Sequence, residues 1–271
     1  DANALSSSQL NLTMGSMGTV TFAKAAGTNV NAIDDVTPKV AEEAWDGASA
    51  SVLQGIGSST NSGAVAYKSP SFDLMGISAS FGVDYDPAAG GTGTGAGNDH
   101  DAVATKDTAK GSGMGAVVKL SHDSGLTLGA GIEEISSNSG KMSADDIVNT
   151  TAYALYTMGP VSVGYQGYYL DNGTVSANGT ATGADYSGDA IGIAFNVNDN
   201  VSLGYQKVSE DKEAYTSSAG VTRDIKSLSA AYSSGGMTMS IQSTDTDNYS
   251  MLTAGNELDT ETVQVTLSFA F

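Results

Sequence analysis

The chain has 271 residues, with 30 Asp and Glu against 11 Lys and Arg, so its formal net charge is −19 at pH 7. A chain this acidic lacks the positive surface that neutralises phosphates, which excludes a nucleic-acid partner. It has no cysteine, which excludes disulfide bonds and thiolate chemistry. No run of about 18 apolar residues is present, so we expect no transmembrane helix.

Apolar and small polar residues alternate with a period of two along almost the whole chain. Such a period predicts β-strands that have one apolar face and one polar face. The last segment is the clearest, because Val263, Val265, Leu267, Phe269 and Phe271 alternate there with threonine, glutamine and serine. Thirteen strands are predicted in this way. Their alternating segments are residues 10–14, 20–22, 65–67, 75–85, 114–120, 126–132, 153–157, 161–169, 191–197, 201–205, 228–232, 237–241 and 263–271.

The connections between these segments alternate between short and long. Short turns are predicted at residues 15–18, 71–73, 123–125, 159–160, 198–200 and 234–236. Long polar segments are predicted at residues 25–62, 87–112, 136–146, 171–184, 209–222 and 244–258. The later hairpins recur about every 37 residues, and each repeat holds two strands, whereas a propeller blade needs four.

The composition of the polar face decides between soluble and membrane-spanning sheets. That face carries almost only Ser, Thr, Gly, Asn and Gln, which suit a water-filled interior. A bilayer requires strands of about 9–11 residues that are apolar on one face, and it requires the sheet to close. The sequence therefore predicts an all-β fold, a transmembrane antiparallel β-barrel that forms a single domain over residues 1–271. The alternative class is an acidic secreted sandwich, β-solenoid or adhesin.

Three segments carry a resemblance to a known family. They are the hairpin Gln9–Lys24 (QLNLTMGSMGTVTFAK), the long acidic segment after it, and the terminal strand Thr262–Phe271 (TVQVTLSFAF). Together they resemble the trimeric general porins of Gram-negative outer membranes. The resemblance implies a homotrimer in the bacterial outer membrane, in contact with lipid and lipopolysaccharide. It also implies a loop that folds into the barrel, and an aromatic C-terminus, Phe271, that assists membrane assembly.

The resemblance also implies more strands than the alternation predicts. Barrels of this family have an even number of strands, usually about sixteen. Two strands instead of five precede the long acidic segment, so we expect about three further strands, roughly 55 residues, before residue 1. An intact mass above the 27.3 kDa of this sequence would support that expectation. The alternative is that one strand was missed or two were merged, which gives twelve or fourteen.

The long segment Ala25–Ser62 is the candidate pore constriction. Its acidic residues are Asp34, Asp35, Glu42, Glu43 and Asp46. Pro38 opens a run, Lys39–Ala44, that is compatible with a short helix, and Trp45 suggests that the loop is packed. Because side chains alternate between the two faces of a strand, three basic residues are expected to point toward the same interior. They are Lys68, Lys119 and Arg223. Acidic residues on the loop and basic residues on the wall would create a transverse electric field in the pore. The alternative is that the pore is acidic overall and prefers cations. The alternative is a solvated surface loop.

The predicted function is passive diffusion of small hydrophilic solutes and ions, without a reaction or a cofactor. A substrate-specific channel is the nearest alternative. An enzyme is not expected, because His100 and His122 fall in a long segment and a short turn, which lie at opposite ends of the barrel. Weak binding of Ca²⁺ to acidic outer segments is a further expectation. The candidate ligands are Asp99, Asp101, Asp145, Asp146, Asp211, Asp245 and Asp247.

Overall fold

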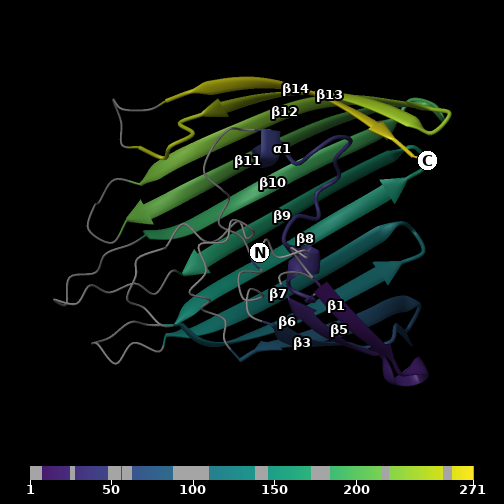
Figure 1. Ribbon diagram of the computed structural model, residues 1–271, viewed down its shortest axis with the longest axis vertical. Coiled ribbons are helices and arrows are strands. Elements are labelled where there is room, and N and C mark those ends of the chain that lie inside the picture. The colour runs from purple at the N-terminus through teal and green to yellow at the C-terminus, as the bar shows by residue number, and fades with distance from the viewer. Residues whose placement is uncertain are drawn as a thin grey trace, which may run out of the picture.

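The computed structural model describes residues 8–24, 28–47, 56, 63–87, 110–137, 146–171, 184–214, 220–252 and 258–270. Their strands form one antiparallel sheet of 14 strands, tilted and curved, with the β1–β2 hairpin at one margin and β14 at the other (Figure 1). The all-β prediction is confirmed. The strands are β1 (Ser8–Thr13), β2 (Thr19–Lys24), β3 (Ala64–Lys68), β4 (Phe72–Leu74), β5 (Ile77–Asp86), β6 (Lys110–His122), β7 (Leu126–Ser137), β8 (Ile147–Met158), β9 (Val161–Asp171), β10 (Ala184–Asn196), β11 (Val201–Ala214), β12 (Val221–Ser234), β13 (Met237–Asp247) and β14 (Thr260–Phe269).

Helical structure is limited to three short pieces in the described part of the chain. They are η1 (Gly15–Met17), η2 (Asn31–Ile33) and α1 (Ala44–Gly47). No helix among the described residues is long and apolar enough to cross a membrane.

The extra strand relative to the predicted thirteen is β4, which continues the line of β3. Both strands pair with β5, and the Ser69 N–H bonds to the Phe81 carbonyl at 2.8 Å between them. The ladder breaks at Pro70, which has no N–H to donate. The sheet order therefore contains thirteen consecutive positions, with β4 beside β5 outside that order.

The turn predicted at residues 71–73 is wrong by a few residues. The chain reverses at Met75 and Gly76, which have φ of 56° and 85°. Leu74 pairs with Ile77 across this two-residue connection. Positive φ at both central residues is the geometry that matches the twist of a tight hairpin, and glycine adopts it without strain.

The two faces of the sheet divide as the period of two predicts. Large apolar side chains stand on the convex face and are solvent-exposed, for example Leu228 at 65% and Val265 at 64%. Exposed apolar area of this extent needs an apolar environment outside the sheet. Other members of this convex surface are Leu10, Leu12, Phe22, Val83, Val118, Leu128, Ile132, Val163, Tyr165, Ile193, Leu203, Ile241, Val263 and Leu267.

The convex apolar surface ends where charged residues begin, toward the long connections. On β11 and β12, Tyr205 and Leu228 stand opposite each other, and the next outward pair is Lys207 and Lys226. The acidic charge that the sequence places in the long segments therefore extends into the strand ends. The outward charged residues of this region include Asp185, Asp189, Lys207, Asp211, Glu213, Asp224, Lys226, Asp245, Asp247 and Glu261.

Among the described strands, β1 and β14 each pair with a single neighbour, β2 and β13. The described sheet is therefore open along these two strands. The closed sixteen-stranded barrel and the additional N-terminal strands stay predictions.

Candidate functional site

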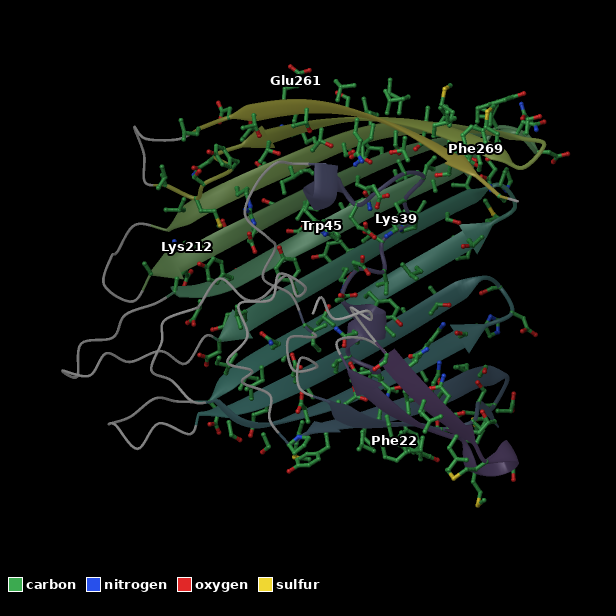
Figure 2. All side chains as sticks on the ribbon, in the orientation of Figure 1. Phe22, Lys39, Trp45, Lys212, Glu261 and Phe269 are labelled. Atoms are coloured by element: carbon green, nitrogen blue, oxygen red, sulfur yellow. The ribbon has the colours of Figure 1, made fainter. Side chains whose placement is uncertain are left out.

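A long stretch of the β2–β3 connection, residues 28–47, lies on the concave face of the sheet. It begins beside β5 and ends with α1, which contacts β11, β12 and β13 (Figure 1). In Figure 2, Lys39 and Trp45 lie on this stretch inside the curve of the sheet, whereas Glu261 projects from the outer side. We refer to residues 28–47 as the inner loop. Both ends of the predicted constriction segment, residues 25–27 and 57–62, lie outside the described residues.

The inner loop is fixed at its start by a buried carboxylate on β5. Asp84 is 4% exposed and accepts three hydrogen bonds, from the Asn29 N–H at 3.0 Å, the Asn29 amide at 2.7 Å and the Val30 N–H at 2.9 Å. The Asn29 amide also donates to the Tyr67 carbonyl at 3.0 Å. Hydrogen bonds to a charged acceptor contribute more than neutral ones, so Asp84 is a strong anchor.

Glutamine side chains on alternate strands hold the middle and the end of the inner loop. Gln166 on β9 donates to the Ile33 and Asp34 carbonyls at 2.8 and 3.0 Å, and accepts the Val36 N–H at 3.0 Å. Gln242 on β13 accepts the Glu42 N–H at 3.0 Å and donates to the Glu43 carbonyl at 3.2 Å. Gln206 on β11, between them, donates to the Thr37 hydroxyl at 3.3 Å. Primary amides suit this task because each one donates and accepts.

Glycines on the concave face allow the inner loop to lie directly against the sheet. A Cβ on Gly164 or Gly192 would overlap Pro38, and one on Gly204 would lie 3.0 Å from Val40. Near the start of the loop, a Cβ on Gly82 would overlap Asn29, and a Cβ on Gly115 would lie 2.7 Å from Val30. The path of the inner loop therefore follows positions that have no side chain.

Two apolar clusters complete the packing of the inner loop. Trp45 and Ala44 pack against Ala190, Val208 and Ile225 of the sheet. At the other end, the cluster consists of Val30, Ile33, Ile56 and Tyr153. Burial of apolar side chains contributes about 25 cal/mol per Å². The loop is therefore packed, as the presence of Trp45 suggested.

The predicted helix over Lys39–Ala44 is wrong, since the only α-helical turn among the described residues of this loop is α1, Ala44–Gly47. The Glu42 N–H and the Glu43 carbonyl bond to Gln242 instead. Backbone groups that are held by the sheet cannot close the hydrogen bonds of a helix.

The five predicted acidic residues have different environments. Glu43 is buried and pairs with Lys39, which also lies 3.7 Å from Asp35. Glu42 is exposed, and Asp34 and Asp35 are half-buried. The backbone of Asp46 belongs to α1, and its side chain lies outside the described part of the structure. Among these carboxylates, Glu42 is therefore exposed, and Asp34 and Asp35 keep partial exposure.

The three predicted basic residues share the concave face but differ in exposure. Lys68 and Lys119 are exposed. Arg223 is 1% exposed, pairs with the equally buried Glu210, and donates to the Tyr249 carbonyl at 3.3 Å. Its charge is therefore buried and paired with Glu210 instead of being exposed to the interior space. This is a correction to the predicted basic wall, which keeps two exposed members.

Loss of the buried arginine should destabilise the fold. We expect Arg223→Ala to cost about 3–5 kcal/mol, because Glu210 would be left as an unpaired buried charge. The temperature at which folded protein converts to the slow-migrating form on SDS gels measures this effect. The double variant Arg223→Met with Glu210→Leu should recover most of the loss, and an unchanged transition in Arg223→Ala would contradict the assignment.

The anchoring residues Asn29, Gln166, Gln206 and Gln242 were not singled out from the sequence. The alternation shows that the three glutamines face the interior, and their long side chains differ from the small Ser, Thr and Gly around them. That contrast in size is the signal that could have identified them. Asp84 and Glu133 also occupy inward positions of their strands, and both are buried.

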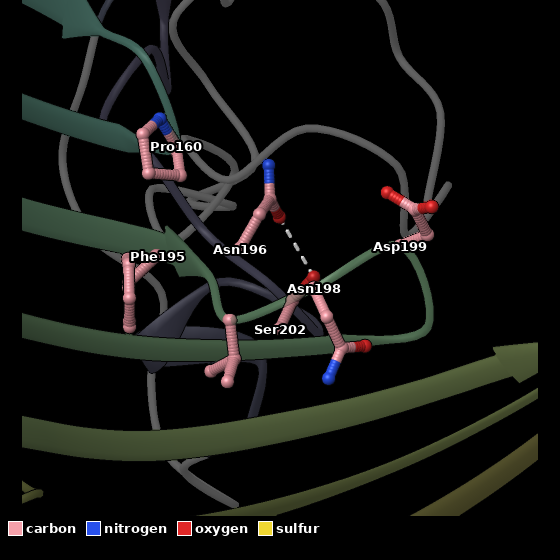
Figure 3. Close-up of a pocket in the computed structure, with 7 residues that line it drawn as sticks. Pro160, Phe195, Asn196, Asn198, Asp199 and Ser202 are labelled. Carbon is pink, nitrogen blue, oxygen red and sulfur yellow. Dashed lines mark hydrogen bonds between the residues drawn. The ribbon is translucent and has the colours of Figure 1, made fainter.

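A hollow at the turn end is lined by Pro160, Phe195, Asn196, Val197, Asn198, Asp199 and Ser202 (Figure 3). Three of its polar side chains bond to one another or to the backbone. Ser202 donates to the Asn196 side chain at 2.8 Å, and the Asn198 side chain accepts the Asn200 and Val201 N–H groups at 2.9 and 3.0 Å. The hollow is part of the turn structure, and we assign it no role.

The metal and enzyme expectations involve residues of the long segments. Asp99, His100, Asp101 and Asp145 lie outside the described residues. In the described ranges, no group of three or more His, Cys, Asp or Glu is placed to hold a metal ion. His122 lies at the β6–β7 turn and bonds to Ser124 at 2.9 Å. Calcium binding stays a prediction.

Comparisons with known proteins give structural matches only. No model of a protein family matches the chain, and no curated protein sequence matches it. The anion-selective porin from Comamonas acidovorans superposes with a TM-score of 0.63 at 16% identity, covering 98% of this chain and 77% of that one. OmpT, an outer membrane protein of Vibrio cholerae, superposes with a TM-score of 0.62 at 13% identity, covering 97% of this chain and 79% of that one. The fold is that of the outer-membrane porins.

A third match agrees with this assignment. The outer membrane channel DcaP of Acinetobacter baumannii has a TM-score of 0.61 at 9% identity and covers 97% of this chain and 83% of its own. In the porin fold the concave face is the inner wall and the convex apolar face is the outer wall. The inner loop therefore lies against the inner wall, from β5 to β13.

Proposed function

We propose that the protein is a passive diffusion channel for small hydrophilic solutes and ions in the bacterial outer membrane. The observation that carries the proposal is the inner loop, which is fixed against a polar inner wall by Asp84, Gln166, Gln206 and Gln242. A loop held in this way narrows an interior space without moving. The exposed apolar residues of the outer wall support placement in a bilayer.

Charge on the inner loop gives this channel a preference for cations. Asp34, Asp35 and Glu42 belong to the inner loop and are at least partly exposed, and Lys39 is engaged with Asp35 and Glu43. Carboxylates beside a pore attract cations and repel anions. Lys68 on β3 and Lys119 on β6 carry the opposite charge. An electric field therefore crosses the interior between the inner loop and this part of the wall.

The preference depends on two accessible carboxylates. Asp35→Asn combined with Glu42→Gln should lower the K⁺/Cl⁻ permeability ratio by about fivefold, which equals about 1 kcal/mol, the scale of one charge pair in water. The reversal potential under a KCl gradient measures the ratio. Asp245→Asn with Glu261→Gln removes the same charge from the outer wall and should leave the ratio unchanged. An unchanged ratio in the inner-loop variant would contradict the role of the loop.

Solute size tests the diffusion function. Liposomes that contain the purified protein should swell in isosmotic sugars, at rates that fall steeply as the sugar becomes larger. Swelling with a single sugar of any size would favour a substrate-specific channel. Liposomes that remain impermeable to all sugars and ions would exclude both kinds of channel and would favour a secreted adhesin.

Assembly as a homotrimer, with lipid and lipopolysaccharide around it, belongs to the same proposal. It is supported by the resemblance of the chain to trimeric porins. Cross-linking in detergent should give a trimer band that collapses to a monomer on heating. No catalytic residues are proposed, and the exchange of solutes needs no energy input.

A further inference from the structure

The inner wall has an uneven distribution of charge along the strands. Between the inner loop and the short turns, its positions carry Ser, Thr, Gly, Ala, Asn and Gln on most strands. In the described part of the wall, the strand charges on this side are Lys68, Lys119 and Asp73. Asp73 accepts the Gly76 N–H at 3.2 Å and belongs to the tight turn of β4 and β5. The two lysines therefore dominate this half of the interior, although the whole chain is strongly acidic.

The register of the sheet brings these lysines close together. Lys68 stands opposite Gly82 of β5, and Lys119 stands opposite Ser80 of the same strand. Adjacent strands are about 4.8 Å apart and two residues span about 6.7 Å, so the two Cα atoms lie about 12 Å apart. Both side chains are long enough to reach a common point above Ser80, whose hydroxyl is a third donor.

Neither lysine is neutralised by a neighbour in the described residues. The ion pairs of the described chain involve Lys39, Lys207, Arg223 and Lys226. The inward carboxylate nearest to Lys68 is Asp84, two residues from Gly82 on the same face of β5. The one nearest to Ser80 and Lys119 is Asp73, which stands opposite Ser78 and accepts the Gly76 N–H of the tight turn. Asp84 is buried under Asn29 and already accepts three hydrogen bonds. Both ammonium groups are therefore available to a ligand in the interior space.

We propose that Lys68, Ser80 and Lys119 form a binding site for small multivalent oxyanions, with inorganic phosphate as the type ligand. This inference rests on the proposed channel function. Phosphate carries about two charges and several acceptor oxygens, so it can engage both ammonium groups and the hydroxyl together. Chloride has one charge and no directional acceptors, so it gains little from the paired arrangement. The site lies between the inner loop and the short turns. A solute that crosses the channel would therefore meet the cation-preferring loop and the oxyanion site one after the other.

Phosphate block of the current tests the site. The probe is inorganic phosphate, added at constant ionic strength to the purified protein in a planar bilayer. We expect a reversible decrease of the KCl current, and the phosphate concentration for half-block should increase at least tenfold in Lys68→Gln with Lys119→Gln. Ser80→Ala should have a smaller effect in the same direction.

The control removes two lysines from the outer wall, Lys207→Gln with Lys226→Gln, which pair with Asp224 and Asp247. It makes the same change in net charge and should leave the block unchanged. Equal weakening in both double variants, or conductance without any phosphate block, would overturn the oxyanion site while the channel remains. Absence of conductance in the unmodified protein would overturn the proposed function itself.

Discussion

Replacing Gln166 and Gln242 together with alanine is expected to break the single steady conductance into several fluctuating levels. The double variant loses five hydrogen bonds between the sheet and the inner loop. At about 0.5–1.5 kcal/mol for each bond, the loss is roughly 3–7 kcal/mol, enough to release the loop from the wall. Single-channel recording at low voltage measures this effect.

Gln264 provides a matched control for that experiment. It stands directly opposite Gln242 on β14 and is exposed, and no hydrogen bond joins it to the described part of the inner loop. Gln264→Ala should therefore keep one steady level. Heat-dependent migration on SDS gels shows whether each variant is folded. A folded Gln166→Ala, Gln242→Ala protein with the steady level of the unmodified channel would contradict the anchoring role.

Replacing Gly192 with valine is expected to lower the conductance instead of making it fluctuate. A Cβ at this position would lie 2.8 Å from the Pro38 nitrogen and 3.0 Å from the Thr37 Cβ. The added side chain would push the middle of the inner loop away from β10, into the interior space, while Asp84 and Gln242 still hold its two ends. Overpacking of this kind costs about 1–3 kcal/mol.

The matched control is Ala194→Val, at the next inward position of β10 toward the turn. It adds a similar volume to the same strand and face, away from the inner loop, and should change the conductance little. The two variants are compared at the same voltage and salt. A Gly192→Val channel with unchanged conductance would show that the loop does not lie against the wall at this point.

The architecture could be predicted from the sequence because a lipid-facing sheet imposes a strict period of two. The alternation of residues 262–269 and 161–169, for example, assigns each side chain to a face without knowledge of its neighbours. The register follows from short connections such as Met75–Gly76, although the position of that turn was misplaced. Pro70 interrupts the β3 ladder in a way that the pattern alone did not show.

The contacts of the inner loop could not be predicted in the same way. Val36 meets Gln166 over a separation of 130 residues, and Glu42 meets Gln242 over 200 residues. Parity places a residue on the inner face but does not say whether the loop covers it. Arg223 shows the consequence, since its inward direction was predicted while its burial in a pair with Glu210 was not. The helix predicted at residues 39–44 failed because distant side chains take up the backbone groups it needs.

Current through single molecules in a planar lipid bilayer tests the central claim most directly. The purified protein, with no ligand or energy source, should insert and give discrete steps whose conductance rises in proportion to KCl concentration, with a reversal potential that indicates a cation preference. Bilayers that show no steps at any protein concentration would contradict the assignment of this chain as a diffusion channel.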